Sequence, residues 1–509
     1  MSNSIILKNS IILYIRLIVT STVGILISRI LLNSLGVEDF GLYAVVGGVV
    51  LMMNLLNTVF ISTSFRFMAF ELGKENSGKA NEIFNISLTL HIAMACLLLI
   101  LAETGGVFYI HHYLKVQSGR IDEALFVFRL SVVAALFSVI SIPYQALITA
   151  KENFFARSVI EILMVFAKLT AALFIISFKG DRLIFYAELM LVASAIAPLA
   201  FIVYSKKAYK YLTVLKFSKD WKTYKDFFKF SSWIMFGAAA SVGKVQGTAL
   251  VINSFFGTAL NAAFGLANQL NTFLIIFAQN VGQAAIPQIT KSYSGGNVDR
   301  SKTLTAAISK FSFFLMLIPA VPILFNTEFI LTIWLKDLPQ YVVIFCKLMI
   351  INALIECSSA GLPAAIHATG RIKYFQIILS CNTLLALPIS YLLFKYKFPP
   401  QTIIFVFIAV SIINNIIAQF FLKFIVGFKI IDYFKKVYLG IIAVIVSLLP
   451  IYFLSGYFQS NMRSLITFSS ISTLWILVSV FFVGLTKEEK IGLKEIFIRL
   501  IGKIKIKYV

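Results

Sequence analysis

The chain has 509 residues, of which 59% are hydrophobic and only 13% are charged. Soluble proteins carry about 25% charged residues, so this composition excludes a soluble globular domain. A net charge of +23 would suit a nucleic-acid partner. The Lys and Arg residues gather instead in short loops between apolar runs, which is typical of membrane topology, and no nucleic acid is expected.

Apolar runs of about 20 residues recur along the whole chain, and each can cross about 30 Å of hydrocarbon as a helix. They predict an all-α polytopic membrane protein with about fourteen transmembrane helices. In chain order the predicted spans are 10–33, 40–63, 84–104, 124–148, 158–178, 183–204, 229–256, 259–285, 303–325, 340–364, 374–394, 401–422, 437–457 and 464–485. The first run lacks a cleavage-site pattern, so we expect it to be retained. Four cysteines lie within the runs and are expected to be free, buried thiols: Cys96, Cys346, Cys357 and Cys381.

The distribution of positive charge predicts the orientation. With the N-terminus in the cytoplasm, the inner segments hold 30 of the 45 Lys and Arg residues, the outer loops hold 8 and the spans hold 7. Eight lie between Lys206 and Lys229, and seven between Lys487 and Lys507. Both termini are therefore predicted to be cytoplasmic. The inner lysines can also contact anionic membrane lipids, as such residues generally do.

The two halves of the chain resemble each other at an offset of 220 residues. This offset aligns Pro143 with Pro363 and Thr149 with Thr369, and it superposes Asn33-Ser34 on Asn253-Ser254. The repeat predicts two pseudo-symmetric six-helix bundles around a central cavity, with two accessory C-terminal helices. The predicted domains are an N-terminal bundle (1–205), a basic cytoplasmic linker (206–228), a C-terminal bundle (229–425), the accessory helices (426–486) and a basic tail (487–509).

Seven cations fall inside the predicted spans: Arg16, Arg29, Arg129, Lys168, Lys244, Lys310 and Lys347. A charge at the bilayer centre costs roughly 2.5–3.5 kcal/mol on the insertion scale. Arg129, Lys310 and Lys347 lie near enough to span ends to extend into water. Arg29 is intermediate, and the remaining three lie deeper.

The deep cations need water, an anionic ligand or an acidic partner. Glu161, Glu188 and Glu356 are the acidic residues inside the spans, with Glu103 at a span edge, so structural ion pairs are one explanation. For Lys168, pairing and ligand binding are equally supported. Arg16 and Lys244 are expected to face a water-filled cavity. Span 1 contains no acidic residue that could pair with Arg16, and Lys244 lies on a helix face of small and polar residues.

Amides form a second polar population within the spans. Candidate sugar-binding residues are Asn57 in span 2 and Asn268, Asn271 and Gln279 in span 8. Interhelical hydrogen bonding is the alternative for any one of them. Span 8 nevertheless has more amides than helix packing requires.

Nothing in the sequence indicates enzymatic chemistry. The chain has no G-x-x-x-x-G-K-[ST] motif, and its four histidines show no metal-ligand spacing. We therefore expect a carrier without a metal or a bound cofactor.

Several motifs carry a family resemblance. Phe40-Gly41-Leu42-Tyr43, Phe255-Phe256-Gly257, the run from Pro287 to Tyr293, and Ala368-Thr369-Gly370-Arg371 resemble Wzx-type polysaccharide flippases. These form the O-antigen and capsule export branch of the multidrug/oligosaccharidyl-lipid/polysaccharide exporter superfamily, which is MATE-like. The resemblance implies a flippase in the bacterial inner (plasma) membrane. It would move undecaprenyl-pyrophosphate-linked oligosaccharide, an O-antigen or capsule repeat unit, to the outer leaflet by alternating access. A polysaccharide polymerase and glycosyltransferases are the implied protein partners.

A pyrophosphate needs cationic partners, since Arg can hold phosphate bidentately and Lys acts as a point charge. The candidates are Arg16, Arg29, Lys168 and Lys244. Transport could draw on the membrane potential, or on a proton or sodium ion bound at Glu188, Glu356 or His91.

Three alternatives stay open. A flippase for a lipid-linked peptidoglycan precursor would share the spans and the cationic lumen. A cation-coupled multidrug antiporter of the same superfamily would need carboxylates in its cavity, where span 1 offers arginines. The third alternative is a non-transporting membrane scaffold for glycosyltransferases.

Overall fold

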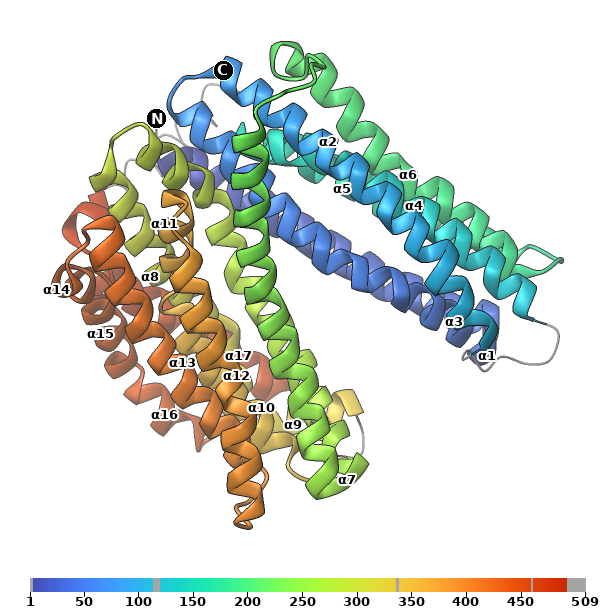
Figure 1. The fold of residues 1–509 in the computed structure, drawn as a ribbon. Coiled ribbons are helices and arrows are strands. Elements are labelled where there is room, and N and C mark those ends of the chain that lie inside the picture. Colours follow the sequence, from blue (N-terminus) through green and yellow to red (C-terminus); the bar gives the residue numbers. More distant parts are fainter. Residues whose placement is uncertain (1–2, 113–119, 336–337, 459–460, 492–509) are drawn as a thin grey trace, which may run out of the picture. The chain divides into compact units, whose positions relative to one another are not determined.

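The computed structural model describes residues 3–112, 120–335, 338–458 and 461–491, without the side chains of 3–4, 25, 32, 37–38, 40–58, 258 and 281. Within this part every regular element is helical and no strand occurs (Figure 1). Contacts divide the chain into two compact units. We call residues 9–235 the first unit, and residues 1–8 together with 236–509 the second unit.

The first unit is built from α1 to α6. Its helices are α1 (Asn3–Gly73), α2 (Ser77–Leu101), α3 (Val107–His112), α4 (Ile121–Ala150), α5 (Phe154–Ile176) and α6 (Arg182–Ala208). A π-helical turn, Ala102–Gly106, joins α2 to α3, so Ser77–His112 forms one long span. Helix α4 packs between α2 and α6, and α5 packs along α6 (Figure 1). The core between them is apolar, with Phe84 and Tyr144 in edge-to-face contact.

The second unit begins within α7 and includes the C-terminal helices. Its helices are α7 (Trp221–Ser294), α8 (Val298–Phe325), α9 (Thr327–Leu335), α10 (Val342–Cys357), α11 (Leu362–Thr369), α12 (Lys373–Lys395), α13 (Thr402–Phe421), α14 (Ile430–Tyr433), α15 (Leu439–Ser447), α16 (Leu449–Ser455) and α17 (Met462–Ser479). Helix α13 packs against both α10 and α12. The accessory helices α15 and α17 pack against α8.

The helices of the second half follow those of the first at a nearly constant offset. Helix α2 starts at Ser77 and α8 at Val298, and α4 starts at Ile121 and α10 at Val342, so both pairs are 221 residues apart. The N-cap residues Asn76 and Asn297 are also 221 residues apart, and each side chain accepts a bond from the backbone N–H three residues on. This confirms the predicted pair of pseudo-symmetric six-helix bundles.

Each half opens with a helix that breaks at a glycine. Gly36 in α1 has φ 78° and ψ 174°, and Gly257 in α7 has φ 80° and ψ −174°. Only glycine adopts this backbone conformation at little cost. No atom lies within 4 Å of the position that a Cβ would occupy at either residue. The backbone, and not the surrounding packing, therefore requires glycine at both breaks.

The helices are long and apolar enough to cross a membrane repeatedly. Among the described residues, 12 helices meet this test, or 13 if α10 and α11, bent by 43°, form one broken span. The predicted span 40–63 falls in the second limb of α1, where most side chains lie outside the described part. The other predicted spans each coincide with one of the 12 helices or with the bent pair.

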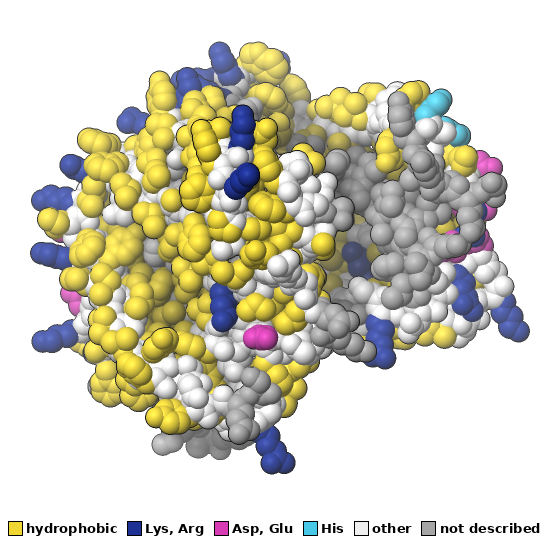
Figure 2. All heavy atoms as spheres, turned by 90° about the horizontal axis from the view of Figure 1, so that it is seen from below, with side chains coloured by type: hydrophobic (Ala, Val, Ile, Leu, Met, Phe, Trp, Pro, Cys, Tyr) yellow, Lys and Arg dark blue, Asp and Glu magenta, His cyan; other side chains and the backbone are white. Residues whose placement is uncertain are grey.

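Large apolar side chains cover much of the described surface (Figure 2). Leu474 and Phe482, for example, are 65% and 67% exposed. Broad exposed apolar surface is typical of a membrane-facing protein. The four cysteines are free, but only Cys346 and Cys357 are buried. The prediction of burial was wrong for Cys96 and Cys381, because a span exposes apolar residues outward as well as inward.

Lys310 corrects another expectation. Its side chain is 1% exposed, and its ammonium bonds Glu489 at 2.5 Å, so it does not extend into water. Glu489 lies beyond α17, too far along the chain for sequence spacing to predict the contact. Arg129 behaves as predicted, with a side chain 57% exposed and a contact to Glu103 at 2.9 Å.

Charged contacts tie the loops together at both ends of the first unit. At one end, Arg120 bonds both Asp39 and Asp181. The bond to Asp39 is the main reason that the pKa of Arg120 is raised. At the other end, Lys79 bonds Asp220 at 2.8 Å, joining the start of α2 to the segment before α7. Loops that alternate along the chain thus gather at opposite ends, as expected for spans of alternating direction.

Candidate functional site

The first polar cluster within the spans lies between α1 and α5. Arg16 of α1 bonds Glu161 of α5 at 2.6 Å, and Arg157 bonds the other carboxylate oxygen at 2.8 Å. Arg157 also donates to the Thr149 hydroxyl at 3.1 Å. The side chains of Arg16, Arg157 and Glu161 are 14%, 19% and 20% exposed. Two guanidinium groups therefore share one carboxylate in a partly buried position.

Lys168 extends this cluster along α5. Residues 161 and 168 are seven apart, so they share a helix face about 10.5 Å apart along the axis. Lys168 is partly buried and forms no ion pair within the described part of the chain. The pairing explanation for Lys168 thus has no partner here, whereas Arg16 is paired. The α1–α5 cluster thus has two cations bonded to one carboxylate, and a third cation, Lys168, about two turns farther along α5.

Arg29 lies apart from these groups. Its side chain is exposed on α1, and no ion pair to it occurs among the described residues. The α1–α5 cluster therefore includes Arg16 and Lys168 of the four predicted pyrophosphate ligands. Lys244, the fourth, belongs to the second unit and has its own surroundings.

A second cluster surrounds Lys244. Its ammonium lies 4.0 Å from Glu356 of α10 and 4.7 Å from the centroid of the Phe407 ring of α13. Asn352 donates to Glu356 at 3.0 Å, and the Ser411 hydroxyl lies 3.2 Å from the same carboxylate oxygen. The Glu356 side chain is 39% exposed, so this carboxylate is within reach of solvent or a ligand.

Two glycines of α7 on either side of Lys244 serve helix packing. A Cβ at Gly237 would lie 2.5 Å from the Gln376 side chain, and one at Gly247 would lie 2.5 Å from Leu387. Both partners belong to α12, so glycine allows α7 and α12 to approach closely. Lys244 lies between the two glycines in sequence and contacts α10 and α13.

The predicted sugar-binding amides do not form one group. Asn57 lies among the residues whose side chains are not described. Asn268 is partly buried and Gln279 is exposed. The side-chain oxygen of Asn271 is buried and has no hydrogen-bond partner in the described part. Of these amides, Asn271 is therefore the one whose buried side-chain oxygen is left for a further hydrogen-bond donor, such as a ligand hydroxyl or water.

The candidate coupling residues differ sharply in access. His91 is fully buried, and its Nδ1 donates to the Ser87 carbonyl at 2.5 Å. Its Nε2 is buried without a hydrogen-bond partner among the described residues. Glu188 is exposed on α6. A side chain that exchanges ions must be accessible. Glu188 and Glu356 are accessible, and His91 is not.

Sequence reasoning missed three residues of these clusters. Arg157 lies one residue before the predicted span 158–178, although its i,i+4 spacing to Glu161 on α5 was available as a signal. Asn352 has the same i,i+4 relation to Glu356. Ser411 comes from another helix, and no local pattern could have identified it.

The fold is shared with solved transporter structures. An outward-facing multidrug resistance MATE family transporter of the MOP superfamily superposes with a TM-score of 0.73 at 14% identity, covering 83% of this chain and 95% of that one. A MATE structure in the bent conformation gives 0.74 at 14% identity, with coverage of 83% and 95%.

A third structure is a MOP superfamily transporter from Pyrococcus furiosus, described as having a binding pocket of reverse polarity that suggests a different function. It gives a TM-score of 0.71 at 12% identity, again over 83% of this chain and 95% of that one. No protein-family model and no curated protein matches the chain. This protein is therefore a multi-pass helical membrane protein with the fold of the MATE transporters of the MOP superfamily.

Proposed function

We propose that this protein is a flippase that carries a lipid-linked oligosaccharide, joined through pyrophosphate, across the bacterial plasma membrane. The observation that carries the proposal is the α1–α5 cluster, where Arg16 and Arg157 share the single carboxylate of Glu161 and Lys168 lies about two turns farther along α5 without an ion pair in the described part of the chain. An excess of positive charge among membrane spans calls for an anion or water. A pyrophosphate supplies the anion.

Lys168 is the best candidate for direct contact with the pyrophosphate. Arg16 and Arg157 already bond Glu161, whereas Lys168 has no carboxylate within reach in the described part. A mobile ammonium without a fixed partner can bind an anion without first breaking a pair. Arg16 and Arg157 would then hold Glu161 away from the substrate and sustain the positive field.

The shared fold supports transport by alternating access, and it leaves the substrate open. The neighbours include a multidrug transporter and one whose pocket polarity is described as reversed. A fold that accommodates pockets of different polarity is compatible with an anionic substrate. The substrate must therefore be inferred from the charges of this chain.

One observation favours a cation-coupled drug antiporter as the second candidate. Glu356 is 39% exposed and accepts a hydrogen bond from Asn352, so its carboxylate is held in place and accessible to a cation. Lys244 argues against a bound drug cation at Glu356. Its ammonium lies 4.0 Å from this carboxylate and already compensates part of its negative charge. Glu356 fits better as a coupling-ion site or as a structural partner of Lys244.

The decisive experiment measures leaflet exposure of a labelled undecaprenyl-pyrophosphate oligosaccharide in proteoliposomes. Wild type is compared with Lys168→Gln, which leaves the Arg16–Glu161 pair intact. We expect the substitution to reduce the initial rate about tenfold, the effect of losing roughly 1.4 kcal/mol of ligand interaction. Arg129→Gln is the matched control, since it also removes a span cation but one that is 57% exposed.

Each outcome has a distinct meaning. A wild type that flips no substrate, yet exports a cationic dye under an ion gradient, would overturn the flippase in favour of the antiporter. If the wild type flips a lipid-linked peptidoglycan precursor faster than the undecaprenyl-pyrophosphate oligosaccharide, the peptidoglycan precursor would be the substrate. Flipping that survives Lys168→Gln unchanged would retain the function and reject the α1–α5 cluster as its site.

A further inference from the structure

The segment between α6 and α7 is held firmly against the start of α2. We call residues 209–221 the linker strap. The Asn85 amide donates to the Val214 carbonyl at 2.8 Å and accepts from the Lys216 backbone N–H at 3.0 Å. Asn81 donates to the same Val214 carbonyl at 3.0 Å. Two α2 side chains thus hold the backbone in the middle of the strap.

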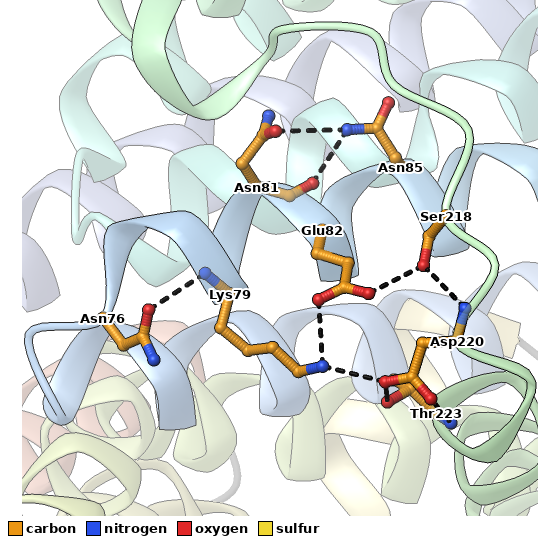
Figure 3. Close-up of polar contacts among 8 residues, drawn as sticks. All are labelled: Asn76, Lys79, Asn81, Glu82, Asn85, Ser218, Asp220 and Thr223. Atoms are coloured by element: carbon orange, nitrogen blue, oxygen red, sulfur yellow. Dashed lines mark hydrogen bonds and ion pairs between the residues drawn. The ribbon is translucent and has the colours of Figure 1, made fainter.

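A polar network fixes the end of the strap as well (Figure 3). Lys79 bonds Glu82 at 2.9 Å and Asp220 at 2.8 Å. Ser218 donates to Glu82 at 2.7 Å and accepts from the Asp220 backbone N–H at 3.1 Å. Asp220 also accepts from the hydroxyl of Thr223, in the first turn of α7. The carboxylates of Glu82 and Asp220 are both engaged inside this network.

The restrained strap presents large apolar side chains outward. Leu215 is 60% exposed, Phe217 is 76% exposed and Trp221 is 81% exposed. Leu212 and Ser218 of the same strap, by contrast, are buried. The exposed residues are therefore not the result of an unrestrained loop, since the backbone between them is hydrogen-bonded to α2.

Lysines surround these apolar groups. The exposed lysines of the strap and its flanks are Lys206, Lys207, Lys210, Lys216, Lys219, Lys222 and Lys225. Lys79 is shared by Glu82 and Asp220, which leaves one negative charge there, and Asp226 is exposed on the flank. These two negative charges offset only part of the charge of the seven lysines. The surface thus combines exposed aromatic and aliphatic groups with a strong excess of positive charge.

The location of the strap follows from its flanks. Arg182–Ala208 and Trp221–Gly257 are both long and apolar enough to cross a membrane. The strap joins two consecutive candidate spans, so it lies on one side of the membrane, next to the ends of both spans. Aromatic side chains concentrate at such interfaces, and lysines there attract anionic lipid headgroups.

We propose that the linker strap is a binding surface for anionic phospholipids, with Phe217 and Trp221 inserted at the membrane interface and Lys216, Lys219 and Lys222 against headgroup phosphates. This role is independent of the transported substrate. An acidic protein would match the lysines equally well. It would leave unexplained why Phe217 and Trp221 are so exposed on a segment that joins two membrane spans.

The test uses the fluorescence of Trp221 in lipid nanodiscs. The chain has four tryptophans, so the signal of Trp221 is obtained as the difference between wild type and Trp221→Phe. Nanodiscs contain an equal mole fraction of either phosphatidylglycerol or phosphatidylcholine, brominated at shallow acyl positions. We expect both lipids to quench Trp221, and the anionic lipid to quench it more strongly at low salt.

A triple substitution tests the lysines, with a charge-matched control. Lys216→Gln, Lys219→Gln and Lys222→Gln together should abolish the difference between the two lipids. The control combines Lys179→Gln, Lys395→Gln and Lys397→Gln, which are exposed in loops predicted to face the other side. It should preserve the difference. In wild type the difference should also shrink with added salt, since exposed charges are screened.

Three results would overturn the proposal. Trp221 that neither lipid quenches would place the strap in water or against a protein. Equal quenching by the two lipids would leave apolar insertion without a preference for anionic headgroups. A difference that the triple substitution preserves would assign the preference to other residues. None of these results depends on whether the oligosaccharide is the transported substrate.

Discussion

Lys310 and Glu489 illustrate how unequally the two partners of a buried ion pair depend on each other. The Lys310 side chain is 1% exposed and that of Glu489 is 25% exposed. Glu489 also accepts from the Thr486 backbone N–H at 2.8 Å, as the glutamate of a capping box does. Glu489 would therefore keep a second partner and some water if Lys310 were lost. Among the described residues Lys310 has no second partner, and with 1% exposure its side chain has almost no access to water.

This asymmetry gives a prediction for two single substitutions. Glu489→Gln leaves an ammonium buried without an acidic partner and should destabilise the protein by about 3–5 kcal/mol, the usual cost of breaking a buried pair. Lys310→Met removes the buried charge and should cost less, since Met is apolar and of similar length. Thermal unfolding in one detergent measures both. Glu103→Gln is the control, because its partner Arg129 is 57% exposed and such surface pairs contribute up to about 1 kcal/mol. Equal losses for the two Lys310–Glu489 substitutions would contradict the argument.

Asp220 provides a pH-dependent prediction. The hydrogen bond from Lys79, together with bonds from Thr223, holds the pKa of the Asp220 carboxyl well below its ordinary value. Because its pKa is lower in the folded state, Asp220 stabilises the folded protein at pH values above the ordinary pKa of an aspartate. This contribution is lost as the pH falls below about 4, towards the folded-state pKa.

The measurement compares thermal unfolding of wild type and Asp220→Asn. The difference in midpoint should be constant between pH 7 and pH 5 and should shrink as the pH is lowered further. Lys79→Gln should remove most of the pH dependence, because the main cause of the depressed pKa would be gone. A difference that grows in acid would have the wrong sign and would contradict the assigned bond.

At the scale of helices, the breaks in α1 and α7 are the features most sensitive to substitution. Gly257→Ala forces a side chain into a backbone conformation that essentially only glycine adopts, which costs about 1–3 kcal/mol. Gly265→Ala is the matched control on the same helix. It has an ordinary helical backbone and no atom within 4 Å of the new Cβ, so it should stabilise by roughly 0.5–1 kcal/mol. Unfolding midpoints in detergent that shift in the same direction for both variants would contradict this account.

The helices themselves were predictable because the bilayer constrains them. A chain in hydrocarbon must satisfy its backbone hydrogen bonds internally, so a run of 20 apolar residues can hardly be anything but a helix. The boundary between the predicted spans ending near 256 and starting at 259 coincides with Gly257. That the join is a single residue in a special conformation, and not a loop, could not be predicted from hydropathy.

The contacts between helices were not predictable, for a physical reason. Spacing shows which residues share a helix face, but it does not show which way that face turns. Glu161, the partner of Arg16, is 145 residues away, and Glu489, the partner of Lys310, is 179 residues away. Arg16 was therefore expected to face an open cavity, and Lys310 to extend into water. Local pairs such as Arg157 and Glu161 were within reach of sequence reasoning and were missed.

At the scale of the whole molecule, the two units differ in the charge that they hold among their spans. In the first unit, Arg16 and Arg157 share one carboxylate, and Lys168 lies farther along the same helix without an ion pair among the described residues. In the second unit, Lys244 faces Glu356, and this cluster is close to neutral. The repeat therefore conserves the helical framework without conserving its charges. We infer that the first unit holds the anionic group during transport, while the second is free to bind a coupling ion or the sugars.

This division makes the response to membrane potential informative. Moving one charge across 100 mV corresponds to about 2.3 kcal/mol, so a pyrophosphate with two uncompensated negative charges would be driven outward by about 4.6 kcal/mol at an inside-negative potential. Proteoliposomes with a potassium diffusion potential set by valinomycin test this. The rate of flipping should rise with an inside-negative potential and fall when the potential is reversed. A rate independent of potential would mean that cations cross with the substrate. In that case Glu356→Gln should slow flipping. This result would identify the exposed carboxylate of the second unit as the site of those cations.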